Sequence, residues 1–302
     1  MRTTCLLLLL LIVGSVLAVD KGRVTPFKSK ESFYIDCQSN SVTLYPGATN
    51  VTWESLQRPD NAVEKLLDQI QASYKTQYVI VMARPDSVKV FRQVRKIVGG
   101  RPIDVDYDAV DAAFKVDWNE PAGQRPGAQI PPYQGADPAK TPIGSKQQPM
   151  FFECRNEQLF YVDKAELDEK VAQVLAALAP GNRSGDPSAF VKAISGKEIG
   201  NDYYKVMPSY LLAGIMALEP KPGVRGDDQA LLWDDSGKFQ QSLRKFDWRN
   251  QYLFFLVRGD SFSIFREARV VADHIGFDVG WELLDKDEPI KFGTGGQMVP
   301  AH

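Results

Sequence analysis

Two short polar segments contain the residue types in this sequence that are best suited to contact a ligand. Each follows an apolar run of strand length, and together they read Arg84-Pro85-Asp86-Ser87 and Arg258-Gly259-Asp260-Ser261. A helix that begins at each Asp-Ser pair would offer free N–H groups, and with the neighbouring arginine these suit an anionic group. The structural alternative is that Asp86 and Asp260 cap the helices and that each arginine pairs with a nearby carboxylate. The candidate binding residues are therefore Arg84, Asp86, Arg258 and Asp260.

Catalytic chemistry has little support in the sequence. The two histidines, His274 and His302, do not lie in a pattern that joins a nucleophile to a base. No Gly-x-Ser-x-Gly, P-loop or dinucleotide fingerprint follows a predicted strand, so no cofactor is expected. Cys-x-x-Cys and His-x-x-x-His spacings are also absent, which argues against a zinc site. We predict no catalytic residue and no metal site.

A run of alternating aspartates is the sharpest candidate for a cation site. Asp104, Asp106 and Asp108 would lie on one face of a strand, where unpaired like charges repel. A calcium loop would also need a glycine and a distal glutamate, and these are missing. We therefore expect salt bridges from this strand to Arg92 and Arg95, on the helix of the same repeat.

An internal repeat organises the chain. Residues 77–110 align without gaps on residues 251–284 at a constant offset of 174, with ten of 34 positions identical. Upstream, residues 33–38 match residues 151–155 at an offset near 117, so the second copy must contain about 57 additional residues. The sequence predicts two tandem related modules, module 1 (residues 32–112) and module 2 (residues 149–290), with the insertion at about 180–236.

Each module is predicted to be a ββαβαβ unit of an α+β fold. Strands are expected at 33–38, 41–45, 78–83 and 104–110, and at 150–155, 158–162, 252–257 and 278–284. Helices with apolar residues at helical spacing follow the hairpin and the third strand of each module. Two helices would then pack on one small mixed sheet in each module.

The remaining segments differ in composition from the modules. Residues 113–148 form a Pro/Gly-rich linker, since residues 115–149 contain seven prolines and four glycines. In the insertion, residues 203–207 favour a strand and residues 210–218 form an apolar segment. Residues 291–302 are glycine-rich and are expected to be a flexible tail.

Residues 1–18 match a secretory signal peptide. Arg2 precedes an apolar run that starts at Cys5, and small or branched residues occupy the cleavage positions in Val16-Leu17-Ala18. The alternative is a retained anchor, but the apolar run of 15 residues to Val19 is shorter than the about 20 residues that span a bilayer. No stable membrane span is expected after cleavage. The sequence therefore predicts a periplasmic or secreted protein.

Two cysteines remain after cleavage, Cys37 and Cys154. An even pair in an oxidising compartment indicates one disulfide. Each cysteine lies in an aromatic strand pattern, however, and such residues are often small buried hydrophobes. Both readings stay open from the sequence.

Composition excludes one class of partner. The 302 residues have a formal net charge of −2, and 25% of them are charged. A nucleic-acid-binding domain needs a dominant basic face. No nucleic-acid partner is therefore expected.

The order of elements resembles the periplasmic domain of the TolR/ExbD family. It is also similar to uncharacterised bacterial secreted proteins with a Tyr-x-x-x-x-x-Val-Arg-Pro-Asp-like strand end, here residues 78–86 and 252–260. The resemblance covers both modules and implies an extracytoplasmic α+β fold. The membrane helix of that family has an aspartate that serves a proton-driven motor, whereas the apolar run here has no carboxylate. A motor role is therefore not expected.

The sequence as a whole favours a non-catalytic binding or scaffolding protein of the cell envelope, with an unknown envelope component or protein as partner. The strand-end arginines are its expected ligand contacts. The alternative is an enzyme, a hydrolase of an envelope polymer, with its site between the two modules and lined by the insertion.

Overall fold

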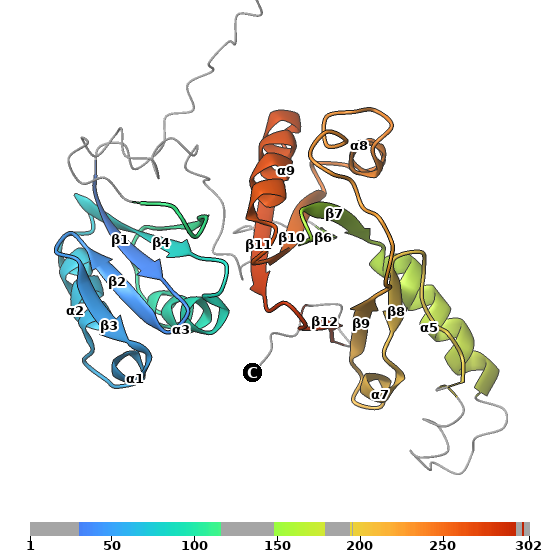
Figure 1. Cartoon of the computed structure of the whole chain (residues 1–302), viewed down its shortest axis with the longest axis horizontal. Coiled ribbons are helices and arrows are strands. Elements are labelled where there is room, and N and C mark those ends of the chain that lie inside the picture. Colours follow the sequence, from blue (N-terminus) through green and yellow to red (C-terminus); the bar gives the residue numbers. More distant parts are fainter. Residues whose placement is uncertain (1–29, 116–147, 179–193, 195, 294–297, 299–302) are drawn as a thin grey trace, which may run out of the picture.

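The chain folds as a mixed α+β protein with three sheets (Figure 1). The structure is a computed structural model that describes residues 30–115, 148–178, 194, 196–293 and 298. The predicted signal peptide, most of the linker, the start of the insertion and most of the tail lie outside the described residues. Among the described helices, none combines the length and the apolar character needed to cross a membrane.

Module 1 is built on a five-stranded sheet with the order β3-β2-β1-β4-β5. Its strands are β1 (Glu31–Cys37), β2 (Ser41–Tyr45), β3 (Thr49–Thr52), β4 (Gln77–Ala83) and β5 (Val105–Ala109). The β1–β2 and β2–β3 pairs are antiparallel, whereas β4 is parallel to both β1 and β5. The helices are α1 (Trp53–Leu56), α2 (Ala62–Ala72) and α3 (Val88–Val98).

The helices of module 1 cover one face of this sheet because apolar residues recur at helical spacing. Asn61 is the N-cap residue of helix α2, and its side-chain oxygen accepts hydrogen bonds from two N–H groups of the first turn, at 3.0 and 3.1 Å. It buries Val63, Leu67 and Ile70. These side chains and those of α3 pack on the alternate residues of β1 and β4 that face them.

Module 2 repeats this strand order in its central sheet, β11-β10-β6-β7. Its elements are β6 (Gln148–Arg155), β7 (Gln158–Val162), α5 (Lys164–Leu178), β10 (Gln251–Arg258), α9 (Phe262–Ile275) and β11 (Val279–Leu284). The β6–β7 pair is antiparallel, and β10 is parallel to both β6 and β11. Strand β6 begins at Gln148, one residue inside the predicted linker.

The predicted insertion adds a further layer to module 2. It contains β8 (Tyr204–Val206), α7 (Pro208–Leu211) and β9 (Met216–Pro220), and α8 (Lys238–Leu243) follows it. Strand β9 pairs with β8 and with β12 (Ile290–Phe292) in the third sheet. The apolar side chains of this layer form a second core on the outer face of β6 and β10.

The prediction of a tail that starts at residue 291 is wrong at its first residues. Ile290 and Phe292 are buried, and the strand that they form pairs with β9. The pattern was missed because only three residues alternate before the glycines begin.

Helix α3 of module 1 packs against β11 of module 2. Figure 1 shows β11 and α9 on the side of module 2 that faces module 1. The Phe91 and Trp281 rings stack with centroids 5.4 Å apart. Arg92 Nη2 donates to the carbonyl of Leu283 at 2.9 Å, and Arg95 Nη1 donates to Glu282 Oε2 at 2.6 Å.

Helix α9 of module 2 makes the matching contacts on β5 of module 1. Arg266 donates to the carbonyl of Ala109 at 3.2 Å and to Asp111 at 2.7 Å. Arg269 lies 3.8 Å from Asp108. Arg266, Arg269, Ala109 and Asp108 are related to the four polar contact residues of the other half by the 174-residue offset. The two halves therefore meet in an interface of two-fold character, in which each arginine pair reaches the edge strand of the other module.

This arrangement corrects the expected salt bridges. The basic helix residues pair with carboxylates on the edge strand of the other module or in the segment that follows it, rather than with the strand of their own repeat. Both repeats contain a basic helix and an acidic strand. The sequence therefore could not distinguish salt bridges within a module from salt bridges between the modules.

Gly259 of module 2 lies directly against the backbone of Pro85 in module 1. A Cβ atom at Gly259 would lie 1.9 Å from the carbonyl oxygen of Pro85, and that oxygen belongs to the backbone. We expect Gly259→Ala to lower the free energy of unfolding by about 3 kcal/mol, because the modules must shift apart. Gly100→Ala is the matched control, since nothing lies within 4 Å of the position that its methyl group would take. Equal unfolding midpoints of the two variants in urea would contradict this packing.

Candidate functional site

Arg84 lies at the carboxyl end of β4 and donates to five acceptors of its own module. Nε and Nη2 bind the carboxylate of Asp36 at 2.7 and 2.9 Å. Nη1 and Nη2 bind three carbonyl oxygens of the segment after β5, those of Asp111, Ala112 and Phe114. The side chain therefore ties the end of β4 to β1 and to the segment that leaves the sheet.

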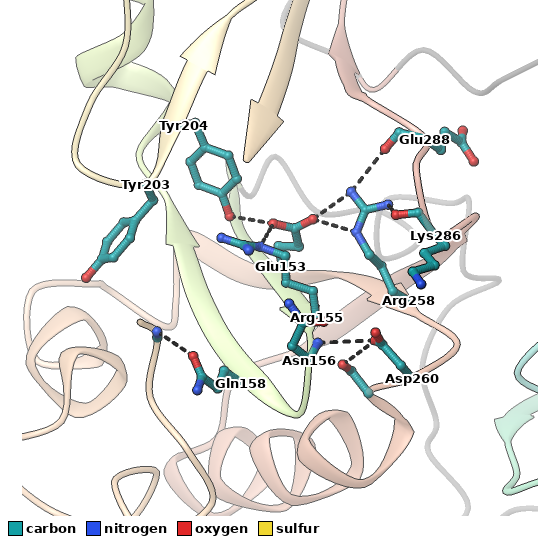
Figure 2. A network of polar contacts seen from close by, with 12 residues as sticks. Glu153, Arg155, Asn156, Gln158, Tyr203, Tyr204, Arg258, Asp260, Lys286 and Glu288 are labelled. Atoms are coloured by element: carbon teal, nitrogen blue, oxygen red, sulfur yellow. Dashed lines mark hydrogen bonds and ion pairs between the residues drawn. The ribbon is translucent and has the colours of Figure 1, made fainter. Parts of the chain in front are cut away.

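Arg258 does the same at the end of β10 in module 2, and it is more deeply buried. Nε donates to Glu153 Oε1 at 2.7 Å, and Nη2 lies 2.7 Å from the same oxygen. The carbonyl acceptors are those of Asp285, Lys286 and Glu288 (Figure 2). These three are the residues at the 174-residue offset from the acceptors of Arg84.

The two strand-end arginines therefore have a structural role. A guanidinium has five N–H donors, and each of these two makes five contacts within the chain. No donor is left for a ligand in this arrangement. The expectation that Arg84 and Arg258 are the principal ligand contacts is therefore not supported.

The expected capping by Asp86 and Asp260 is wrong. Helices α3 and α9 begin after Ser87 and Ser261, and no side-chain capping bond is made by either N-cap residue. Asp86 is exposed. Asp260 accepts from the N–H of Asn156 at 3.2 Å and from the hydroxyl of Ser261 at 2.7 Å, so it fixes the β6–β7 turn against α9.

Of the two readings of Cys37 and Cys154, the disulfide is not formed in the structure. Cys37 and Cys154 are free, fully buried thiols at the ends of β1 and β6, in two different sheets. Burial raises the pKa of each thiol well above its ordinary value, and the neighbouring carboxylates add to that shift. Both residues are small parts of the cores beneath the helices, in agreement with the second reading of the sequence.

A hollow of about 460 Å³ lies at the carboxyl ends of β6 and β10 in module 2. One wall comes from the insertion, with Met207, Tyr210 and Pro220. Glu219 of the insertion also lines it. The other lining residues belong to the ends of the central sheet and to the segment before β12: Arg155, Asn156, Arg258, Asp260, Lys286, Asp287, Glu288 and Pro289. The carboxyl ends of strands in a layered sheet are common ligand sites. Of the predicted residues, the structure brings only Arg258 and Asp260 to this hollow.

Below the hollow lies a buried polar cluster around Glu153. This carboxylate is fully buried and accepts from Arg258, from Arg155 Nε at 2.9 Å and from the hydroxyl of Tyr204 at 2.9 Å (Figure 2). Burial raises the pKa of Tyr204 well above its ordinary value, and the charge of Glu153 raises it further. Tyr204 is therefore neutral, and one carboxylate faces two guanidinium groups.

Arg155 is a site residue that the sequence did not predict. Its guanidinium carbon lies 3.9 Å from the centre of the Phe160 ring, and its Nη2 is buried without a hydrogen-bond partner among the described residues. At the offset near 117, the matching residue of module 1 is Gln38, whose amide donates to Thr43. The signal in the sequence was this exchange of a neutral residue for a charged one between the two repeats.

A second buried polar group lies at the junction of the modules. Burial, and after it the charge of Asp108, raises the pKa of Asp106 to about 7. The pKa of Asp108 is raised to about 6 by burial, against the effect of Arg269. Asp108 Oδ1 is buried and has no hydrogen bond among the described residues. Glu282 is the residue of module 2 that matches Asp108 at the 174-residue offset. Its side chain is one methylene longer and accepts a hydrogen bond from Arg95.

Neither a metal-binding group nor a known relative points to a function for this site. Within the described ranges, no three His, Cys, Asp or Glu side chains lie together in a way that could hold a metal ion. A scan against models of protein families and a search of curated proteins find no match to the chain.

Proposed function

We propose that the chain is a non-catalytic binding or scaffolding protein of the cell envelope, exported to the periplasm or secreted. The observation that carries the proposal is the hollow in module 2. The inserted segment, which has no counterpart among the described residues of module 1, supplies one of its walls. A segment added to one copy of a repeated unit, at a strand-end hollow, is typical of a binding site grafted onto a scaffold.

The duplication belongs to this proposal. The shared strand order of the two central sheets, the two sets of arginine–carbonyl contacts and the matched interface support the origin of both modules from one unit. In that scheme module 1 is the partner that stabilises module 2, because their apolar side chains form one continuous core. The TolR/ExbD resemblance stays a prediction.

The hydrolase alternative is less well supported. It placed a site between the modules, where the described contacts are the Phe91–Trp281 stack and the arginine–carboxylate pairs. His274, the one histidine among the described residues, contacts the ring of Trp233. That pair lies outside the hollow.

Retention by an envelope fraction tests the proposal. We expect the full chain to be retained and Met207→Trp, which fills the hollow, to reduce retention at least fivefold. Leu212→Trp is the matched control, because this exposed residue of the same segment does not line the hollow. The control should be retained like the wild type.

The proposal fails if the wild type is not retained, or if both tryptophan variants, folded by circular dichroism, are retained equally.

A further inference from the structure

The interface between the modules has two matched halves that differ in charge. In one half, Arg92 and Arg95 of α3 pair with two carboxylates of module 2, those of Glu282 and Glu288. Two cations therefore face two anions there. The other half has one additional carboxylate, that of Asp106 on β5. At the 174-residue offset, module 2 has Gly280 in its place, which has no side chain.

The arginines of this second half are engaged by other carboxylates. Arg266 of α9 pairs with Asp111 at 2.7 Å, and Arg269 lies 3.8 Å from Asp108. Asp106 makes no ion pair with the described residues, and Arg269 acts on it only at longer range. Its Oδ1 accepts a hydrogen bond from a backbone N–H group at 2.9 Å. The junction therefore contains more negative than positive side chains.

Both central carboxylates of this half are shielded from water. Asp106 is 9% exposed and Asp108 is 6% exposed, and they lie on the face of β5 opposite Tyr107. Their register partners on β4, Ile80 and Met82, are uncharged. The other titratable or charged groups that the described residues place on this face of β4 and β5, after β5 and on the adjacent turns of α9 are Tyr78, Asp104 with its partner Lys30, Asp111, Arg266, Arg269 and Asp273.

A buried carboxylate without a paired cation is favoured in its protonated form. Burial, and after it the charge of Asp108, raises the pKa of Asp106 to about 7. If α9 moves away from β5, water reaches the carboxyl group and its pKa returns toward 3.8. The closed junction then holds a proton that the open junction has lost. Between these two pKa values, rising pH therefore favours the open junction.

We propose that Asp106, Asp108, Arg266 and Arg269 form a pH-sensitive latch between the modules, closed when Asp106 is protonated and open when it ionises. Opening exposes the Arg269 guanidinium and the outer edge of β5, and such an edge can pair with another chain. The latch is a property of the interface, and it does not depend on the binding function proposed for the hollow.

Chemical modification of arginine in the full chain measures the opening. Phenylglyoxal modifies accessible arginines, and peptide mapping reports the rate at each site. Arg269 is 6% exposed, so it reacts when the latch opens. Its rate is divided by that of the exposed Arg244 in the same sample, which corrects for the effect of pH on the reagent. We expect this ratio to rise about tenfold from pH 6 to pH 8, mostly below about pH 7.

Arg258 distinguishes the latch from unfolding. This side chain is 4% exposed and makes all its contacts within module 2, so it becomes accessible only when that module unfolds. At pH 8 we expect Arg269 to be modified at least about tenfold faster than Arg258, because local opening requires less free energy than unfolding.

Two variants assign the pH dependence to one residue. Asp106→Asn cannot ionise and keeps an oxygen for the N–H of Tyr107. Its ratio should change by less than about twofold from pH 6 to pH 8. Asp202→Asn, at an exposed carboxylate of module 2, should show the rise of the wild type.

Three results would overturn the inference. The first is a wild-type ratio that is the same at pH 6 and pH 8, which needs no variant. The second is equal modification of Arg269 and Arg258, which would assign the exposure to unfolding of the module. The third is a rise like that of the wild type in folded Asp106→Asn.

Discussion

Replacement of Arg258 by methionine is expected to lower the free energy of unfolding by about 3–5 kcal/mol, measured by urea denaturation. The substitution removes a side chain that is 4% exposed and leaves three backbone carbonyls without their donor. It also removes one of the two cations that face the fully buried Glu153. Breaking a buried pair from one side is costly because the remaining charge cannot reach water.

Two comparisons make this result specific. Arg84→Met should cost less, since the Arg84 side chain is 14% exposed and water can partly replace its contacts. Arg244→Met, at a half-exposed surface pair, should change the free energy of unfolding by no more than about 0.5 kcal/mol. A loss below about 1 kcal/mol in Arg258→Met would contradict the structural role of the strand-end arginines.

Asp106→Asn is expected to stabilise the protein at pH 8 by on the order of 3 kcal/mol. The pKa of Asp106 rises from an ordinary value of 3.8 to about 7, because it is buried beside the charge of Asp108 and is only partly offset by Arg269. Between these two values the folded state holds a proton that the unfolded state has lost. The free energy of unfolding should therefore fall as pH rises from about 4 to about 7. Asparagine keeps an oxygen for the N–H of Tyr107, which Asp106 accepts at 2.9 Å.

The measurement is the free energy of unfolding of both proteins from pH 4 to pH 8. The two curves should converge near pH 4 and separate with rising pH. Asp202→Asn, at an exposed carboxylate of module 2, should change the free energy of unfolding by no more than about 0.5 kcal/mol. Parallel curves for wild type and Asp106→Asn would contradict the buried, raised state of this carboxyl group.

The sequence was sufficient to predict the principal elements of both central sheets. Continuous apolar runs predicted β4 and β10, and helical spacing predicted α2 and α5, because burial on one face or two leaves a periodic pattern. The short strands β3 and β12 were missed, since three or four residues give too few repeats of the pattern.

The candidate site was harder to predict because its components come together only through tertiary contacts. The recurrence of Arg84 and Arg258 was visible, but their carbonyl acceptors have no side-chain signature. The residues of the hollow come from the ends of β6 and β10, the insertion and the segment after β11, which are far apart in sequence. Arg155 became a candidate only when the distances showed that Glu153 is shared between two guanidinium groups.

The internal sequence repeat also explains why local pairing was the wrong expectation at the interface. The acidic strand and basic helix occur in both repeats, so within-module and between-module pairing use the same residue types. Backbone geometry decides between them, because each edge strand, β5 or β11, faces the helix of the other module.

The most direct test of the account is a crystal structure of the full chain. We predict that the Arg258 guanidinium binds Glu153 and three carbonyl oxygens of the segment after β11, and that the Phe91 and Trp281 rings stack between the two modules. An Arg258 side chain that faces solvent, or modules that do not share the Phe91–Trp281 contact, would contradict the account.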